Sequence, residues 1–216
     1  MIHRRNRFFE GRLQWCLVLA MAGLIIAGCK KEEDTSLQAD PLKRETIPAT
    51  DTLSHAITGN TLLNASHPWY IKGWVYVSNE ASLRIEPGSV IKILPEEKSN
   101  AGGIIITRGS TIYAAGTERL PIHVSMQENG YIIVLGKAPV GNRFAEMENP
   151  ENKLWPGLTY GGKDKRDSSG ILQHIQIDYP AGKYGELKLL GTGNRTVVKS
   201  VTTHLSTKGL GASHLP

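Results

Sequence analysis

IEPGSVI at residues 85–91 and ITRGSTI at residues 106–112 repeat one pattern, 21 residues apart. In each segment an apolar β-branched run stops at a Gly-Ser pair and then resumes. A strand, a tight corner and a second strand recurring at such a spacing are typical of a solenoid, because one coil cannot bury its own apolar face and must stack on a neighbour. These segments therefore predict a stack of coils built from short strands.

A second repeat sets ILQHIQID at residues 171–178 against VVKSVTTH at residues 197–204, an offset of 26 residues. Because side chains alternate across a strand, Ile177 should face the core and Asp178 should face outward. Stacking of the two segments then brings Asp178 beside His204 on the outer face of the sheet.

The remaining apolar runs are short and are separated by turn residues, with no helical period. We expect strands in YIKGWVYV (residues 70–77), LRI (83–85), SVIKI (89–93), GIIITRGSTIYAAG (103–116), PIHV (121–124) and YIIVLG (131–136). With coils of about 20–27 residues, residues 55–216 accommodate roughly seven coils. The predicted fold is all-β, a right-handed parallel β-helix solenoid.

An antiparallel β-sandwich is the alternative architecture, since it also uses many short strands with frequent turns. Its hairpins favour Asn-Gly or Asp-Gly turns, and the sequence contains one such pair, Asn129-Gly130. The Gly-Ser corners at residues 88–89 and 109–110 fit a solenoid better than a set of hairpins.

Composition and charge narrow the class of protein further. The chain has 216 residues, of which 40% are hydrophobic and 21% charged, which suits a folded domain with appendages rather than a disordered chain. Its formal net charge is +5, but +3 of this lies before residue 29. The rest lacks the clustered basic face that nucleic acid requires, so no nucleic-acid partner is expected.

The first 28 residues are typical of a secretory signal. Residues 1–12 are basic, and the apolar run LQWCLVLAMAGLIIAG at residues 13–28 is long enough for a signal-peptide core and short for a membrane span. Its end, Ile26-Ala27-Gly28 followed by Cys29, resembles a bacterial lipobox. We therefore expect a lipoprotein signal peptide at residues 1–28 and acylation, such as palmitate, on Cys29, which would hold the protein on a membrane. An uncleaved anchor helix is the alternative.

Residues 29–52 are predicted to form a flexible tether, because they are polar, contain Pro41 and Pro48 and lack periodicity. Cys29 with the following charged run, residues 30–34, resembles the export signal of surface lipoproteins in Bacteroidetes-type bacteria. That resemblance implies an outer-membrane, lipid-anchored protein exposed at the cell surface. The β-helix domain is expected at residues 53–216, with a C-terminal truncation because the sequence stops soon after a strand.

The strand cores and corners together resemble a family of lipid-anchored or secreted Bacteroidetes proteins. The resemblance rests on GWVYVSNEASLRIEPGSVIKI (residues 73–93), IIITRGSTIYAAGTERLPIHV (104–124), IIVLGKAPVGN (132–142), YGGKDKRDSSGILQHIQIDY (160–179) and GELKLLGTGNRTVVKSVTTH (185–204). It covers most of residues 55–205 and implies a right-handed β-helix of the pectin-lyase-like fold. The matching motifs are structural and carry no catalytic signature.

The outer columns of the predicted stack supply the candidate catalytic residues. Asp178 and His204 should be neighbours, with His174 and Lys199 nearby. Polysaccharide lyases of this fold place acidic metal ligands and a basic proton acceptor on such an outer sheet, and acid–base chemistry needs two groups with displaced pKa values. The sequence offers one carboxylate there, and outward polar residues are the ordinary state of a solenoid surface. Ca²⁺ is expected only if the chain is a lyase; otherwise no cofactor and no metal are expected.

Tryptophans are the candidate glycan-stacking residues, because their rings can pack on the apolar face of a sugar. They are Trp69, Trp74 and Trp155. Alternatively, Trp69 and Trp74 cover the N-terminal end of the core, as bulky amphipathic rings can. Trp155 adjoins Pro156 and Gly157 and is expected in an exposed loop.

These observations favour a cell-surface lipoprotein that presents a rigid β-helix to a glycan or to another envelope protein, without catalysis. The alternative is a polysaccharide lyase or glycoside hydrolase built on the same fold.

Overall fold

The computed structural model describes residues 45–98, 100–141, 144–148 and 154–206. The predicted signal peptide, Cys29 and the tether up to residue 44 lie outside these residues, as do residues 207–216. The described residues form strands, turns and loops without an α-helix. Within them, no helix is long and apolar enough to span a membrane.

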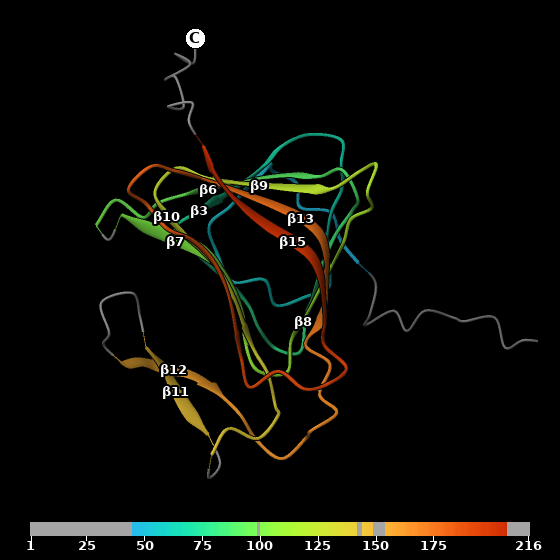
Figure 1. Ribbon diagram of the computed structural model, residues 1–216, viewed down its shortest axis with the longest axis vertical. Helices are drawn as coiled ribbons and strands as arrows, with labels where there is room; N and C mark the ends of the chain where they lie inside the picture. The colour runs from blue at the N-terminus through green and yellow to red at the C-terminus, as the bar shows by residue number, and fades with distance from the viewer. Residues whose placement is uncertain (1–44, 99, 142–143, 149–153, 207–216) are drawn as a thin grey trace, which may run out of the picture. The chain divides into compact units, whose positions relative to one another are not determined.

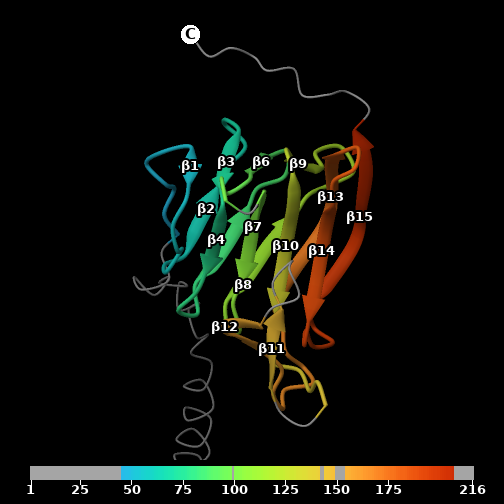
Figure 2. The same ribbon diagram turned by 90° about the vertical axis from the view of Figure 1, so that its left-hand side faces the viewer.

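The chain winds in coils around one axis, and the strands of successive coils stack along this axis (Figure 1 and Figure 2). Stacked strands form three sides of the solenoid, which we call faces. We number the faces in the order in which the chain passes through each coil. The first face holds β2 (Thr61–Leu63), β5 (Ser82–Ile85) and β8 (Thr111–Ala115). The second holds β1 (Thr52–Leu53), β3 (Trp69–Lys72), β6 (Val90–Leu94) and β9 (Ile122–Met126). The third holds β4 (Trp74–Val77), β7 (Ala101–Ile106), β10 (Asn129–Leu135) and β14 (Gly185–Leu190).

Two long strands, β13 (Gly170–Pro180) and β15 (Val197–Ser206), continue from the first face into the second. The first part of β13 pairs with β8 and its later part pairs with β9. Every pairing within the three faces is parallel. This excludes the antiparallel sandwich and confirms the predicted all-β, parallel β-helix.

The described chain passes the first face six times. The first pass is a single bridge from Thr46 to Thr61, and the later passes are β2, β5, β8, β13 and β15. The sequence predicted roughly seven coils over residues 55–216. The structure has fewer because the 34 residues between β10 and β13 carry a hairpin outside the stack instead of another coil.

The 26-residue repeat marks the true coil period at the C-terminal end. Residues 171–178 of β13 pair in register with residues 197–204 of β15, including Asp178 with His204. The buried Ile177 and the half-buried Asp178 confirm the predicted alternation of the strand.

The 21-residue repeat, in contrast, is not a coil period. Ile85 ends β5 on the first face, whereas Ile106 ends β7 on the third face. The neighbours that stack on Ile85 are Leu63 and Ala114, at offsets of 22 and 29 residues.

What the two segments share is the chemistry of a corner. Gly88 and Gly109 both have positive φ, at 81° and 99°, a conformation that side chains other than glycine rarely adopt. The serine that follows each glycine, Ser89 or Ser110, turns inward and is buried. The repeat therefore indicated corners correctly and the coil length incorrectly.

Inward side chains form columns along the axis of the stack. On the second face Trp69, Ile91, Val124 and Ile177 follow one another in register, each at most 2% exposed. Each ring or branched chain covers the one below it, so apolar area is removed from water at every level. The residues of this column pack in one apolar core with the inward residues of the first and third faces.

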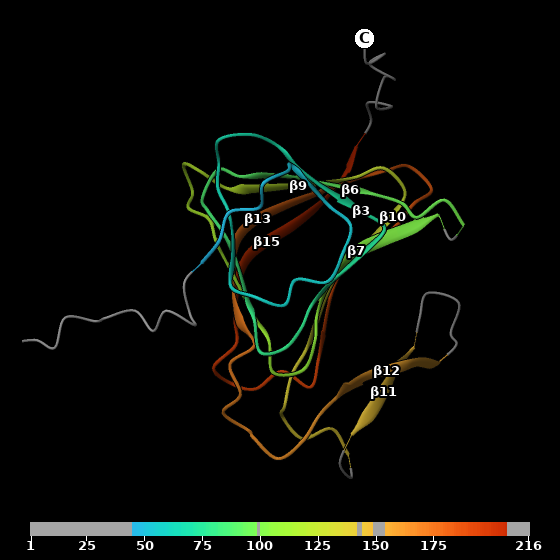
Figure 3. The same ribbon diagram turned by 180° about the vertical axis from the view of Figure 1, so that it is seen from behind.

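The third face differs from the others because β7 and β10 are buried on both sides. The outer side is covered by a hairpin of β11 (Ala145–Glu148) and β12 (Leu154–Tyr160), which pair antiparallel beside the stack (Figure 3). Met147 and Leu158 of the hairpin pack with Ile105, Ile133 and Leu135 in a second apolar cluster.

Arg108 fastens both ends of this hairpin to a corner of the stack. Its Nε donates a hydrogen bond to the carbonyl oxygen of Gly161 at 2.7 Å, just after β12. Its guanidinium also lies 4.8 Å from the ring centre of Phe144, just before β11, a favourable cation–π arrangement. The hairpin is therefore held at its base as well as along its apolar side.

The stack begins earlier than the predicted boundary at residue 53. Thr46 donates its backbone N–H to the carbonyl oxygen of Asn60 at 2.8 Å, and Thr52 pairs with Tyr70 in β3. Residues 46–52 are thus part of the first coil and not of the tether, because their backbone groups bond to the next coil.

The last described coil leaves apolar side chains in water. Val198 lies directly above the buried Leu172, yet it is 42% exposed, and Leu205 is 54% exposed. Only Val201 of this strand packs against the core, and it does so partly.

Removing one inward side chain should test the stacking. Ile177→Ala is expected to lower the free energy of unfolding by about 2–5 kcal/mol, because it leaves a cavity in a column with no solvent access. Gln176→Ala, its outward neighbour, should change it by less than about 0.5 kcal/mol. Urea unfolding followed by circular dichroism measures both, and equal effects would contradict the assignment of the faces.

Candidate functional site

The predicted pair Asp178 and His204 occupies one outward row of the second face. This row runs through Tyr70, Lys92, Ser125, Asp178 and His204 in consecutive strands. The row therefore places one carboxylate between a serine and a histidine. The His204 ring contacts the Thr202 hydroxyl at 3.0 Å on its own strand.

His174 and Lys199 lie apart from this row. His174 sits at the bend of β13 between the first and second faces, where its φ is +47°. Ser200 has the corresponding position in β15, with φ of +52°. Lys199 is opposite Gln173 on the first face and is exposed. Of the four candidate residues, the structure brings together Asp178 and His204.

Within the described part of the chain, no three His, Cys, Asp or Glu residues gather closely enough to hold a metal ion. Ca²⁺ takes about six to eight oxygen ligands, and the row that contains Asp178 supplies one carboxylate. The Ca²⁺ of the lyase alternative therefore has no ligand set that can be named among these residues.

The three candidate tryptophans have different environments. Trp69 is fully buried in the core, and its indole N–H donates to the carbonyl oxygen of Asn64 at 2.8 Å. It therefore cannot stack on a ligand at the surface. Trp74 lies on the outer side of β4 rather than over the end of the core, and Trp155 belongs to β12 rather than to a loop. Both of these rings are half-buried.

Trp74 and Trp155 belong to an aromatic group on the outer side of the third face. The Trp74 ring is stacked on Tyr131, with centres 5.8 Å apart and planes at 22°. Trp155 meets Trp74 edge-on at 4.9 Å and Tyr76 edge-on at 6.3 Å. Such offset and edge-to-face contacts are the favoured arrangements of aromatic rings.

Gly103 makes the contact between Trp74 and Tyr131 possible. It pairs with Trp74 on one side and with Tyr131 on the other, so it separates the two residues along the row. A Cβ at this position would lie 2.1 Å from the carbonyl oxygen of Tyr131. The absence of a side chain lets the two rings approach each other across the middle strand.

A groove of about 530 Å³ opens beside this group at the corner between the second and third faces. We call it the aromatic groove; its lining residues are Ser54, Lys72, Gly73, Trp74, Tyr76, Glu96, Glu97 and Lys98. Its size falls within the range of about 300–1,000 Å³ that is usual for small-molecule sites. Three successive coils contribute to it, so it is a product of the stacking.

Backbone pairing at the corner fixes the walls of the groove. The N–H of Gly73 donates to the carbonyl oxygen of Leu94 at 3.0 Å, which joins two coils. The loop after β6 is closed by the Glu96 N–H, which donates to the carbonyl oxygen of Ala101 at 2.9 Å. These hydrogen bonds fix the backbone next to Trp74 and at Glu96.

The groove carries two lysines and two glutamates, which balance in formal charge. Burial raises the pKa of the Tyr76 phenol above its ordinary value, and the negative charge of Glu96 raises it further, while the Trp155 side chain opposes the change. Burial likewise raises the pKa of Tyr131, with smaller contributions from Glu186 and Tyr184. Both phenols thus remain neutral hydrogen-bonding groups at physiological pH.

The sequence analysis singled out Trp74 of this groove but missed Lys72, Glu96, Glu97 and Lys98. A signal for Glu96, Glu97 and Lys98 was present, because the polar segment at residues 95–100 is longer than a tight corner between two apolar runs requires. Such an insertion between stacked strands is a place where a solenoid builds a binding surface.

Comparison with known families matches residues 55–208 to the family described as the pectate-lyase-like β-helix domain. The match covers the strands from β2 to β15, the row that contains Asp178 and every lining residue of the aromatic groove except Ser54. No curated protein and no solved structure matched the chain.

The raised pKa values predict a pH dependence of stability. The unfolded chain releases its phenolic protons near pH 10, below the pH at which folded Tyr76 and Tyr131 do so. The contribution of these protons to stability is complete below about pH 10 and is lost as the pH rises through the folded pKa values. The double variant Tyr76→Phe/Tyr131→Phe should therefore lose less stability than the wild type between about pH 8 and 11.

Urea unfolding at a series of pH values measures this difference. Tyr70→Phe on the second face is the matched control, because it also removes a phenol hydroxyl from a strand of the stack. Superimposable curves for the wild type and the double variant would contradict the prediction.

Proposed function

Because the chain belongs to the family with a pectate-lyase-like β-helix domain, we propose that it binds a glycan in the aromatic groove and does not cleave it. The observation that carries this proposal is the pairing of the half-buried Trp74 and Tyr76 rings with carboxylates and lysines in one groove. A sugar presents an apolar C–H face and a hydroxylated edge, and the groove offers partners for both.

The chemistry of the two sides of the groove supports this assignment. Aromatic rings pack on apolar faces while their polar ends bond to neighbours. The carboxylates of Glu96 and Glu97 accept hydrogen bonds from hydroxyl groups, and the ammonium groups of Lys72 and Lys98 donate them. Because the formal charges balance, the groove favours an uncharged glycan over a polyanionic one such as pectate.

The rigidity of the groove is the second support. Binding costs free energy when side chains and loops must be ordered, and a preformed site avoids part of that cost. Trp74 is held between Tyr131 and Trp155, and the loop that carries Glu96 is closed by backbone hydrogen bonds. A sugar would therefore meet the Trp74 ring, and the backbone that carries Glu96, already in place.

The proposed location is the outer face of the outer membrane in a Bacteroidetes-type bacterium, with the protein held by lipid on Cys29. The supports are the lipobox-like end of the signal peptide, the charged run after it and the polar segment before the first coil. At the cell surface the groove would meet environmental or envelope glycans; another envelope protein is the other partner class considered.

A polysaccharide lyase is the alternative function, and the neighbouring Asp178 and His204 are its support. In that reaction a base removes a proton next to a carboxylate and the glycosidic bond breaks by elimination, which leaves an unsaturated sugar. His204 would be the candidate base, and Asp178 its orienting or charge-stabilising partner.

Glycan binding is tested by screening the purified chain against neutral and acidic glycans and titrating each hit by calorimetry. Trp74→Ala should weaken binding at least about tenfold, as expected for a central aromatic contact. Glu96→Gln, which keeps the shape of the groove, should weaken it by a smaller factor. Tyr184→Ala, an exposed ring outside the groove lining, is the control and should bind like the wild type.

The same mixtures distinguish binding from cleavage. Unchanged glycan after long incubation, with and without Ca²⁺, agrees with the proposal. Unsaturated products that disappear in Asp178→Ala or His204→Ala would establish the lyase instead.

The lipid anchor has its own test. Labelled palmitate should enter the chain in a Gram-negative host and should be absent from Cys29→Ser. Cys16→Ser, the matched cysteine inside the signal peptide, should retain the label, because only the residue after the lipobox accepts the lipid. Label that persists in Cys29→Ser would exclude the anchor.

A further inference from the structure

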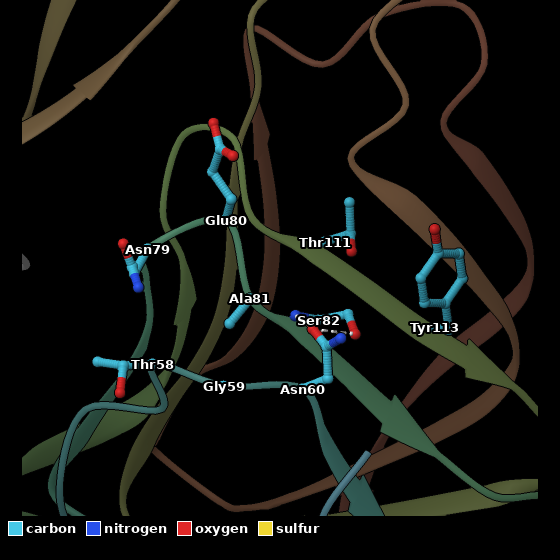
Figure 4. A pocket seen from close by; sticks show the side chains of 9 residues that line it. All are labelled: Thr58, Gly59, Asn60, Asn79, Glu80, Ala81, Ser82, Thr111 and Tyr113. Carbon is cyan, nitrogen blue, oxygen red and sulfur yellow. Dashed lines mark hydrogen bonds between the residues drawn. The ribbon is translucent and has the colours of Figure 1, made fainter. Parts of the chain in front are cut away.

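A second cavity lies at a different corner of the stack, between the third and first faces (Figure 4). It has a volume of about 360 Å³ and is formed by residues before β2, at the start of β5 and in β8, which belong to successive coils. We call it the corner cavity; its lining residues are Thr58, Gly59, Asn60, Asn79, Glu80, Ala81, Ser82, Thr111 and Tyr113. It shares no residue with the aromatic groove and plays no part in the function proposed above.

The turn at residues 78–81 forms one wall of the corner cavity. The Ala81 N–H donates to the carbonyl oxygen of Ser78 at 3.2 Å, and Asn79 and Glu80 have φ of +59° and +57°. Two successive positive φ values define a type I′ turn, in which asparagine and then glycine are the preferred residues. Asn79 follows that preference, but Glu80 stands where glycine would be relaxed.

The next coil shows how the same corner is built without strain. There Ser110 donates its N–H to the carbonyl oxygen of Thr107 at 2.9 Å, and the residue with positive φ is Gly109. The fold therefore does not require a carboxylate at this corner. A side chain held in an unfavourable backbone conformation is a sign of function when nothing structural repays the strain.

Glu80 makes no hydrogen bond or ion pair within the described residues. Lys137 and the Cγ of Glu80 both lie beside Gly109. Lys137 forms no ion pair with Glu80, and it is not a lining residue of the cavity. Arg84, which is adjacent to Tyr113 in the stack, is engaged with Glu45 at 3.0 Å. The carboxylate of Glu80 is therefore the one charged group among the lining residues, and it is available to a ligand.

The rest of the lining is neutral and rich in hydroxyl and amide groups. The Asn60 side-chain oxygen accepts hydrogen bonds from the N–H and the hydroxyl of Ser82, both at 3.0 Å, which fixes this part of the wall. In Figure 4 these two residues lie between Thr58 on one side and Tyr113 on the other, and Glu80 stands at the rim of the cavity with its carboxylate directed away from them. The cavity thus offers one negative charge, an array of short polar groups and one aromatic ring.

We propose that the corner cavity binds an amino sugar, with the carboxylate of Glu80 pairing with the ammonium group of the ligand. The sugar hydroxyls suit Ser82, Thr111 and Thr58, which can both donate and accept hydrogen bonds. The ring of Tyr113, which is 40% exposed, supplies a face for the apolar side of the sugar. A charge-assisted hydrogen bond to Glu80 makes the amine the distinguishing group.

Calorimetric titration of the purified chain with glucosamine and with glucose tests this proposal. Glucosamine should bind at least tenfold more tightly than glucose at neutral pH. Glu80→Gln keeps the size of the side chain and should remove that preference. Tyr184→Ala, an exposed ring that lines neither the corner cavity nor the aromatic groove, is the control and should leave glucosamine affinity unchanged.

Glu80→Gly provides an independent readout. It relieves the positive-φ strain, so its thermal midpoint should equal or exceed that of the wild type while glucosamine affinity falls at least tenfold. A stabilised Glu80→Gly variant that binds glucosamine as the wild type does would overturn the proposal. Equal affinities of the wild type for glucosamine and glucose would also overturn it.

Discussion

The structure depends on the inability of any single coil to shelter its own apolar side. Leu63, Ile85, Ala114 and Leu172 lie in one inward column of the first face, and each is buried because the next coil lies on top of it. The parallel backbone ladders follow from this stacking, since coils in register also satisfy the N–H and C=O groups of their neighbours. The last described coil shows the converse, because Val198 continues the same column and is 42% exposed.

The sequence was sufficient to predict the architecture and the faces of the last two coils. Residues 171–178 and 197–204 bend at corresponding positions, His174 and Ser200, and neither has an insertion relative to the other, so their alignment gave the true register. The earlier repeat misled because glycine and serine make similar corners at different places in a coil, and similarity between corners does not measure coil length. The hairpin between β10 and β13 was missed for a related reason: its strands are short, and Trp155 next to Pro156 and Gly157 looks like a loop until the partner strand is known.

The binding surfaces were harder to predict than the fold. The neighbours Asp178 and His204 follow from the register of two strands, and the sequence contains that register. The aromatic groove and the corner cavity instead combine residues from three coils whose loops differ in length. The two tryptophans, in contrast, follow a simple rule. Trp69 and Trp74 are five residues apart, and the alternation of side chains continues through Gly73, so one ring lies inside the core and the other on its outer side.

The hairpin of β11 and β12 is an insertion, and the coils before and after it still stack directly on each other. Ala114 and Leu172 are 58 positions apart in the chain, yet they are direct neighbours in the core. Gly161 returns the chain to the corner by donating its N–H to the carbonyl oxygen of Gly136 at 2.8 Å, so the excursion begins and ends at almost the same point. Segments of different length and sequence could be exchanged at this position during evolution or by engineering. The stacked coils would keep their backbone hydrogen bonds while the molecule acquired a new outer surface.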